Sequence, residues 1–561
     1  MDDNTPTHFN VLIVGTGLAE SILAAALSKS GYSVLQLDSA PYYGTEHASL
    51  SLTELDQWVR DRPERAHAST GLRPDLVSRS QRFALSLFPV LLRASGPGIE
   101  LLVRSKVATY LQFGLLAGVG LWTPDSDSDS DNVPKAKGKV ERVPASKADV
   151  FNDPNLSLIE KRRLTKLLLF AASQEPLETD QVLAANPEIT CLEYLAKAYN
   201  LKGTVAESLA YALALCSSPQ DPAFEALQRL RSIIDSVGRY GPSPYLVGHY
   251  GGAGDLVGGF SRICAVWGGG QILGRPLLPL DLSPPAGTPV PASQPPFMVH
   301  ENPPPPPANP ADQQTGTRPL GIPVQLEDNG EAPTIFTGDW VISSPHLLPT
   351  LFPSAVRAST TLSTPESDTL NLVAILPTRI PFPAAASKND TSDEGVAEET
   401  PASLSDSNLF VVPPKALDER VGTVTALQLG SGTMSCPEGY HVLYLSASLL
   451  ARADNDDRTT LDLTPYLESL VALAPEPIEP LYTATYRTPA SPQTILENSL
   501  PANLLVTPTL PSRGKTAGLI TTLDEVVTLV EDMFWKIVGP EGKAEGVEFF
   551  RKEVTTDQDE D

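Results

Sequence analysis

The segment VLIVGTGLAESILAAALSKSGYSVLQLDSAPYYG, from Val11 to Gly44, decides the fold class. Its first residues, Val11–Val14, form a continuous apolar run that ends at Gly15, as expected for a central parallel strand buried on both faces. Leu18–Lys29 places apolar residues at helical spacing, and Gly31 is a stop signal for that helix. This order of strand, glycine turn and helix predicts the start of a Rossmann-type dinucleotide-binding unit.

A second strand, Val34–Leu37, is followed by the acidic residue Asp38, 23 positions after Gly15. This spacing is typical of the carboxylate that binds the ribose of a dinucleotide. The turn has Gly15 and Gly17, but Glu20 stands where a third glycine belongs. A glycine there permits close packing of the helix against the strand, and the helix N-terminus faces the pyrophosphate. The Glu20 carboxylate suits the helix dipole but repels a pyrophosphate, so we predict this fold without a flavin or any other cofactor.

Length, charge and cysteine content limit the kind of protein. At 561 residues the chain is long enough for two or more packed domains with loops. Its net charge of −26 and pI near 4.7 argue against nucleic acid as a partner, because neutralising phosphates requires a basic surface. The four cysteines have no paired spacing, so we predict neither a zinc site nor a disulfide framework, and a reducing compartment.

Targeting signals also have recognisable sequence patterns. The first residues lack the basic segment and long apolar core of a secretory signal. No stretch approaches the roughly 18 uninterrupted apolar residues of a membrane span. The final segment, Asp557–Asp561, is acidic and carries no prenylation cysteine. We therefore expect a soluble cytoplasmic protein.

Composition divides the chain into folded and unfolded parts. Segment 124–138 contains Asp-Ser repeats, segment 283–320 is rich in proline, and segment 384–407 is rich in small and acidic residues. Such compositions cannot bury enough apolar surface to fold. The proline run fits a linker better than a ligand for an aromatic groove. The folded parts predict a discontinuous α/β flavoprotein-like domain with a mixed sheet and an all-helical insertion. Its predicted parts are flavoprotein-like segments at 1–80, 238–282, 321–383 and 408–550, an inserted helical domain at 81–237, a linker at 283–320, an acidic loop at 384–407 and an acidic tail at 551–561.

Periodicity predicts the remaining elements. Ser157-Leu158-Ile159-Glu160 is a capping box that opens a helix with one apolar face. That face consists of Leu164, Leu167, Leu168 and Ala171. Further helices are predicted at about 82–116, 204–216, 223–237 and 523–537, and strands at 340–343, 370–376, 424–429 and 442–445.

Three blocks carry a resemblance to a known superfamily. They are DSAPYYGTEHASLSL (38–52), RYGPSPYLVGHYGGAGDLVGGFSRICAVWGGGQIL (239–273) and VTALQLGSGTMSCPEGYHVLYLSA (424–447). Together they resemble the Rab GDP-dissociation inhibitors and Rab escort proteins. Members of this superfamily share a flavoprotein-like fold, a GTGLxE turn and no flavin. The resemblance therefore implies that Glu20 is a family feature.

The resemblance also implies a platform for a Rab GTPase. The family platform residues correspond to Tyr43, Asp255 and Arg262. This chain departs from the family pattern by one extra residue within YGGAGD, by Asp255 in place of glutamate, and by Val257-Gly258 in place of Pro-Gln. From the residues alone, Tyr43 can also be a packed aromatic beside a turn, and Asp255 and Arg262 can form an internal ion pair.

A fourth segment, VERVPASKADVFNDPNLSLIEKRRL (140–164), resembles the escort branch, which has an ADVFN element that the inhibitors lack. The resemblance implies that Phe151 and Arg162 contact the α subunit of geranylgeranyltransferase type II. The alternative is that Phe151 is a hydrophobic plug beneath the helix start and Arg162 a solvated charge.

The resemblance thus implies a non-catalytic escort protein. Such a protein binds GDP-bound Rab, presents it to the α/β transferase, shields the geranylgeranyl lipid in an apolar cleft of the helical domain, and delivers Rab to a membrane. One alternative is a Rab GDP-dissociation inhibitor that acts only in membrane recycling. Another is an amine-oxidase-like flavin oxidoreductase that would use Gly15, Gly17 and Asp38 for its cofactor.

Overall fold

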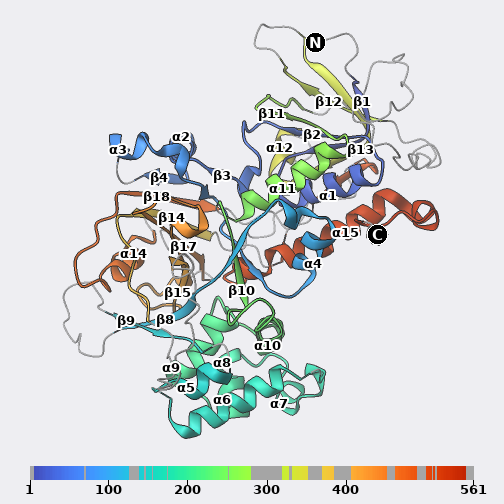
Figure 1. Cartoon of the computed structure of the whole chain (residues 1–561). Coiled ribbons are helices and arrows are strands. Elements are labelled where there is room, and N and C mark those ends of the chain that lie inside the picture. The colour runs from blue at the N-terminus through green and yellow to red at the C-terminus, as the bar shows by residue number, and fades with distance from the viewer. Residues whose placement is uncertain are drawn as a thin grey trace, which may run out of the picture.

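In the computed structural model of this protein, two large β-sheets and a block of helices lie beside one another (Figure 1). The predicted unfolded segments and the acidic tail fall outside the described residues, except at their edges. The structure describes residues 6–68, 71–124, 138–144, 147–154, 156–173, 175–250, 252–279, 319–326, 332–351, 369–383, 406–450, 462–488, 501–507, 510–511 and 515–550.

The first sheet has six strands in the order β11-β2-β1-β13-β12, with β19 also paired to β13. All its pairings are parallel except that of β12 with β13. The central strand β1 is buried on both faces, as the apolar run Val11–Val14 predicts. The strands are β1 (His8–Val14), β2 (Val34–Asp38), β11 (Gly270–Leu273), β12 (Leu320–Val324), β13 (Thr334–Ser343) and β19 (Leu504–Val506).

Helices α1 (Leu18–Lys29) and α11 (Ala253–Val266) pack against this sheet and against each other, and α15 (Gly518–Ala544) packs on α1 (Figure 1). The bounds of α1 are those predicted from its periodicity. Ser21 to Leu27 of α1 are all buried, since neighbouring helices cover it on more than one side. The close packing of α1 on α11 matters for the site, because α1 follows the glycine turn and α11 carries Asp255 and Arg262.

The second sheet has eight strands in the order β4-β18-β14-β17-β16-β15-β8-β9. Only the pairing of β8 with β15 is parallel, so the sheet is mixed, as predicted. Three of its strands contain the segments predicted as extended, 370–376, 424–429 and 442–445. The strands are β4 (Ala66–Ala68), β8 (Gly118–Pro124), β9 (Gly138–Arg142), β14 (Thr369–Leu376), β15 (Asn408–Val412), β16 (Val421–Leu429), β17 (His441–Leu449) and β18 (Tyr482–Thr488).

The helix predicted at 82–116 was wrong. Within this range α4 and the short turn η3 are helical, and the remainder consists of the short strands β5, β6 and β7 joined mostly by turns and irregular backbone. Strands β6 and β7 pair on either side of β10, which lies more than 100 residues later in the chain. A short apolar run is compatible with a buried strand as well as with a helix. Here pairing with the distant strand β10 favours the extended conformation. The elements are β5 (Leu85–Ser86), β6 (Leu91–Arg93), α4 (Pro97–Arg104), η3 (Val107–Thr109), β7 (Phe113–Leu115) and β10 (Tyr245–Gly248).

The helical block is therefore narrower than the predicted inserted domain at 81–237, because β8 and β9 belong to the large sheet. Helix α6 starts at the predicted capping box, in which Ser157 and Glu160 cap each other, and its predicted apolar face is buried. The helix predicted at 204–216 is a short α9 that continues as a π-helical turn, η5. The helices are α5 (Lys147–Asn152), α6 (Leu158–Ala171), α7 (Gln181–Ala185), α8 (Cys191–Tyr199), α9 (Gly203–Glu207), η5 (Ser208–Leu213) and α10 (Ala223–Ile234).

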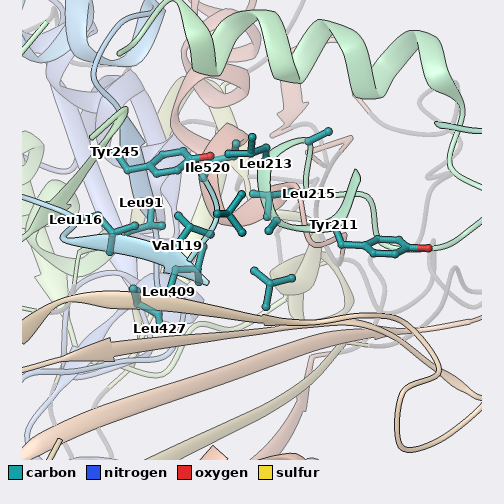
Figure 2. Close-up of a cluster of buried hydrophobic side chains, with 14 of the residues drawn as sticks. Leu91, Leu116, Val119, Tyr211, Leu213, Leu215, Tyr245, Leu409, Leu427 and Ile520 are labelled. Carbon is teal, nitrogen blue, oxygen red and sulfur yellow. The ribbon is translucent and has the colours of Figure 1, made fainter. Parts of the chain in front are cut away.

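A buried apolar cluster joins the helical block to the large sheet (Figure 2). The π-helical turn and the residues after it contribute Leu213 and Leu215, which lie near Val119 of β8 in the picture, and Tyr211 at the edge of the cluster. Burial of this apolar surface stabilises the junction, so the block is anchored to the sheet and not only tethered to it. Other described elements are α2 (Leu52–Arg60), α3 (Pro74–Val77), α12 (Leu348–Leu351), α14 (Thr464–Val471), β3 (Ser49–Leu50) and short 3₁₀ turns at 45–47, 80–82, 177–179, 345–347 and 431–433.

Candidate functional site

The glycine turn between β1 and α1 has the backbone of a dinucleotide site. Gly15 adopts a φ of 107°, which favours glycine, and its N–H donates to the carbonyl of Leu37 at 2.8 Å. Gly17 is the residue before α1, and no side chain caps the helix there. The turn therefore leaves a helix N-terminus facing the position where such folds bind a pyrophosphate.

The carboxylate of Glu20 lies at that position. A Cβ atom placed on Gly17 would be 2.5 Å from Oε2 of Glu20, so the carboxylate covers the glycine that a phosphate would approach. Glu20 is only 4% exposed, and its Oε1 accepts a hydrogen bond of 2.7 Å from the Thr507 hydroxyl. Burial raises the pKa of Glu20 above its usual range. The chain thus supplies its own acidic group at the helix N-terminus.

Asp38, the predicted ribose carboxylate, is 1% exposed and is bound entirely by its own chain. Its Oδ2 accepts from the Thr16 N–H at 3.0 Å, from the Thr16 hydroxyl at 2.7 Å and from the Thr45 hydroxyl at 2.7 Å. Its Oδ1 accepts from the Ala40 N–H at 2.9 Å. A ribose hydroxyl would have to displace these donors.

Histidines and a serine fill the remaining space beside the turn. A cavity of about 40 Å³ is left between His47, Ser344 and His346. That volume suits a few water molecules and is far below what a flavin dinucleotide needs. Burial lowers the pKa of His47 to about 4, so the imidazole is neutral near pH 7 and offers no positive charge to a phosphate. The residues present do not fit a flavin. Glu20 occupies the phosphate position, Thr16 and Thr45 bind the carboxylate of Asp38, and the remaining cavity is too small.

The Tyr43 side chain lies on the surface beside α11. Its ring is 40% exposed, and its hydroxyl donates to Oε1 of Gln271 at 2.9 Å. The amide nitrogen of Gln271 donates to the side-chain oxygen of Gln36 at 3.0 Å and to the carbonyl of Ser261 at 3.2 Å. Tyr43 is therefore fixed to the backbone of α11 one residue before Arg262, which agrees with an exposed anchor and not with a buried aromatic.

Asp255 and Arg262 lie two turns apart on α11, so they are on one face of that helix. Arg262 is exposed, and its guanidinium lies 4.3 Å from the ring centroid of Tyr110. Asp255 is half-buried, and burial raises the pKa of its carboxyl to about 6. Within the described part of the chain no ion pair joins these two side chains, which disfavours the internal ion pair as their role.

The departures from the family pattern have defined places. The segment YGGAGD, which holds the extra residue, covers the turn before α11 and the start of that helix. Gly252, with a φ of 84°, directly precedes α11, and Gly251 is outside the described residues. Val257 is fully buried, whereas Gly258 is exposed with open space around it. The substitution of Pro-Gln by Val257-Gly258 therefore leaves the fold intact and removes one side chain from the face between Asp255 and Arg262.

A second surface lies on the helical block. Phe151 is 64% exposed on α5, and its carbonyl accepts from Nζ of Lys161 at 2.9 Å. Arg162 is exposed on the first turns of α6. Leu158 and Ile159, the first two residues of α6, are 86% and 63% exposed. The exposure of Phe151 contradicts the alternative of a buried plug.

Sequence reasoning missed Gln271, Tyr110 and the exposed pair Leu158 and Ile159. Gln271 is inside a quoted motif block, but its role depends on a contact with Tyr43 across 228 residues. No sequence signal distinguishes Tyr110. The first turn of α6 did carry a signal, because two apolar residues follow the capping serine off the predicted apolar face.

A protein-family model described as GDI, GDP dissociation inhibitor, matches residues 1–283, just over half of the chain. The chain belongs to the GDP dissociation inhibitor family. This family assignment confirms the resemblance that its motifs indicate.

Curated relatives come from both branches of the superfamily. The Rab proteins geranylgeranyltransferase component A of Drosophila melanogaster is 32% identical over 294 residues, which are 49% of this chain and 54% of that protein. The protein of the same name from Saccharomyces cerevisiae is 32% identical over 273 residues, or 47% of this chain and 43% of the relative. The Rab GDP dissociation inhibitor beta of Canis lupus familiaris is 30% identical over 273 residues, or 48% and 57%. The chain thus spans about half the length of the curated relatives it matches.

Solved structures confirm the fold class. A crystal structure of Rab GDI from Plasmodium falciparum matches with a TM-score of 0.61 at 20% identity, covering 95% of this chain and 99% of that one. An oxidoreductase from Methanosarcina mazei matches with a TM-score of 0.55 at 14% identity, covering 93% and 99%. At such identities the match concerns the fold alone, and it supports the predicted flavoprotein-like architecture.

The described residues contain neither a membrane-spanning helix nor a cluster of metal ligands. No helix among them is both long and apolar enough to cross a membrane. Nor do they contain a group of three or more His, Cys, Asp or Glu side chains placed to hold a metal ion.

Proposed function

We propose that this chain is a Rab escort protein. It binds a Rab GTPase in the GDP state and presents it to the α/β heterodimer of geranylgeranyltransferase type II for prenylation of C-terminal cysteines. It then shields the lipid and delivers the GTPase from the cytosol to a membrane. The chain itself performs no chemistry and acts as the accessory component of the transferase.

One observation carries the GTPase-binding part of this proposal: Tyr43 is tied to α11 beside Arg262. The Tyr43 hydroxyl, the Gln271 amide and the Ser261 carbonyl form a continuous hydrogen-bonded connection. It places a half-exposed aromatic ring next to the helix that bears Asp255 and Arg262. An aromatic anchor with an arginine and a partly desolvated acid is the composition typical of a protein-binding hot spot.

The choice of the escort branch depends on the α5–α6 surface. Identities of 32% and 30% to relatives from the two branches are too similar to separate them. Phe151, Leu158 and Ile159 are exposed apolar residues within a short stretch, with Arg162 beside them. Exposed apolar residues gathered around a charged one favour a protein contact, and the resemblance assigns Phe151 and Arg162 to the transferase.

The lipid needs an apolar environment. A geranylgeranyl group has about 20 carbons, and each buried CH₂ contributes roughly 0.8 kcal/mol, so it is not left in water. The helical block contains a cavity of about 280 Å³ between β9, α6 and α9, which contacts Leu156, Leu164 and Leu209. Charged side chains, among them Glu141, Arg142 and Lys202, also line this cavity, so it is not a purely apolar cleft. Placing the lipid in the helical block therefore rests on the family resemblance.

The decisive experiment is a prenylation assay on unmodified, GDP-loaded Rab with the transferase heterodimer and labelled geranylgeranyl diphosphate. We expect incorporation of the label to require this chain. A Rab variant without its C-terminal cysteines is the substrate control. A chain that fails to support prenylation, yet extracts prenylated Rab from membranes, would instead be a dissociation inhibitor.

An oxidoreductase is disfavoured despite the shared fold. The flavin position is occupied by Glu20, and the ribose carboxylate Asp38 is bound by Thr16 and Thr45. We expect the purified chain to show no flavin absorbance near 450 nm, where about one bound flavin per chain would give a clear band. Such a band would support the oxidoreductase reading.

A further inference from the structure

We propose that Asp38 positions the Tyr43 loop, with Thr16 and Thr45 as its hydrogen-bonding partners. The Tyr43 loop is residues 39–47, between β2 and β3. This role deepens the proposed function, on which it rests, because Tyr43 belongs to the predicted GTPase platform. The carboxylate that dinucleotide-binding folds use for ribose would here hold a protein-binding loop in place.

Asp38 binds the loop at two points, one before Tyr43 and one after it. At the start, the Ala40 N–H donates to Oδ1 at 2.9 Å. Beyond Tyr43, the Thr45 hydroxyl donates to Oδ2 at 2.7 Å. The one carboxylate therefore fixes the chain on both sides of Tyr43, and hydrogen bonds to an ionised acceptor are stronger than neutral ones.

Thr16 links the glycine turn to the same loop. Its hydroxyl donates to Oδ2 of Asp38 at 2.7 Å and accepts from the Gly44 N–H at 3.0 Å. Thr16 is fully buried, so these bonds are shielded from water. Gly44 directly follows Tyr43, and its amide is thus held to the first βα turn of the Rossmann unit.

The loop needs such support because its backbone is strained. Thr45 has a φ of 49°, an uncommon conformation for a β-branched residue. Gly44 has a φ of 101°, and a Cβ atom there would lie 2.8 Å from the backbone of Ala48. Conformations of this kind persist only where surrounding contacts hold them. Without the bonds to Asp38, we expect the loop to leave this conformation and the Tyr43 ring to lose its fixed place.

A fixed Tyr43 is ready to bind, so a partner does not have to order the loop. Removal of one hydrogen bond to Asp38 should therefore weaken GTPase binding, although neither Thr16, Asp38 nor Thr45 needs to contact the GTPase. Thr45→Val removes one hydroxyl, keeps the β-branched shape and leaves Asp38 bound to Thr16. Thr16→Val removes both the hydroxyl bond to Asp38 and the hydrogen bond from the Gly44 N–H. Thr45→Ser retains the hydroxyl and is the conservative rescue.

The first measurement needs no partner. Hydrogen exchange at residues 39–47 should be faster in Thr45→Val and in Thr16→Val than in the wild type, and unchanged in Thr45→Ser. Thr485→Val is a control for the substitution itself, because it removes a threonine hydroxyl that donates to the His67 carbonyl at 3.3 Å in the other sheet. Unchanged exchange across the loop in both valine variants would overturn the proposed positioning role.

The second measurement is a double-mutant cycle on affinity for GDP-loaded Rab. We expect Thr45→Val to weaken binding about tenfold in the wild type, as for loss of a hydrogen bond to a charged group. In a Tyr43→Ala chain the same change should cost less than about twofold, because the two effects act through one side chain. An equal loss of Rab affinity in both backgrounds would show that the bond between Thr45 and Asp38 does not act through Tyr43. A wild-type chain that binds no Rab would refute the proposed function, while loop exchange would still decide the positioning role.

Discussion

The hydroxyl of Tyr43 donates a hydrogen bond of 2.9 Å to the side-chain oxygen of Gln271, across 228 residues of sequence. Gln271 in turn binds the carbonyl of Ser261, so its amide fixes the ring from the Tyr43 loop against α11. The packing of α1 on α11 brings the glycine turn and this helix together. Tyr43 is thus linked to the helix that bears Asp255 and Arg262 because the Rossmann unit and α11 pack against each other.

Gln271→Leu should weaken binding of GDP-loaded Rab by about 0.5–1.5 kcal/mol, the usual contribution of one hydrogen bond. The substitution keeps the size of the side chain but removes both its donor and its acceptor. Titration calorimetry would measure the change. In a Tyr43→Phe chain, which already lacks the bonding hydroxyl, Gln271→Leu should have a smaller effect. Full additivity of the two changes would contradict the linkage.

Arg262→Ala should reduce Rab affinity by about 2 kcal/mol or more, as truncation of an interface arginine commonly does. Arg262 is exposed and stacks on Tyr110, so its loss should leave the melting temperature nearly unchanged. Arg73→Ala is a suitable control, because Arg73 is another exposed arginine, paired with Asp75. Unchanged Rab affinity in a well-folded Arg262→Ala protein would remove Arg262 from the platform.

Asp255→Asn should weaken Rab binding and yet stabilise the free chain at neutral pH. Burial raises the pKa of Asp255 to about 6 from an ordinary value of 3.8. Between these pH values the folded chain binds more protons than the unfolded chain, so this group's contribution to stability falls as the pH rises. Above about pH 6 the ionised carboxylate destabilises the fold, and the neutral amide relieves this.

Melting temperatures at pH 4 and pH 7.5 would test the sign. The Asp255→Asn chain should melt higher than the wild type at pH 7.5, and the difference should shrink at pH 4. In parallel, wild-type Rab affinity should fall as the pH drops through about 6, and that of the variant should change less. A variant that melts lower at pH 7.5 would show that the Asp255 charge stabilises the free chain.

Local patterns predicted the first βα unit well because its signals lie within one stretch of chain. The glycine turn, the apolar period of α1 and the capping box at Ser157 each involve residues a few positions apart. The same reasoning failed at 82–116, where β6 and β7 are strands because they pair with β10. There the deciding partner is distant in sequence, and local periodicity carries no information about it.

The site residues were predictable by motif, but their contacts were not. Asp38 was predicted as a ribose carboxylate from its position at the end of β2, whereas its bond to Thr45 depends on how the following loop folds back. Glu20 was recognised as a repulsive group, but its partner Thr507 lies 487 residues later. Such contacts form only in the assembled fold. The sequence therefore indicated which acidic groups lie at the turn, but not which side chains donate hydrogen bonds to them.

Glu20→Gly should not produce a flavoprotein. The substitution restores the third glycine, but Asp38 stays bound by Thr16 and Thr45, and His47 and Ser344 still fill the space beside the turn. Expression with excess flavin, followed by an absorbance spectrum of the purified variant, measures the outcome. Stoichiometric flavin in the variant would show that Glu20 alone closes an otherwise intact site.

The α5–α6 surface is where the proposed escort role can be tested against that of a dissociation inhibitor. Phe151 is 64% exposed on α5, and Arg162 is exposed on α6. If the two residues dock the transferase, Phe151→Ala and Arg162→Ala should each abolish binding of the α/β heterodimer. Both variants should keep Rab affinity and melting temperature, because neither side chain is part of the core. A core phenylalanine would instead cost about 3–5 kcal/mol of stability on truncation.

The same surface allows a matched control on one helix. Ile159 is 63% exposed beside Arg162, so Ile159→Ser should also weaken transferase binding, by about 1–2 kcal/mol, if it contributes apolar contact area. Leu169 is 51% exposed but lies at the other end of α6, so Leu169→Ser should have no effect on this contact. Transferase affinity, Rab affinity and melting temperature measured on all four variants separate docking from folding. Retained transferase binding in both Phe151→Ala and Arg162→Ala would refute the escort assignment at these residues, and an equal loss in Leu169→Ser would show that the contact is not localised at the start of the helix.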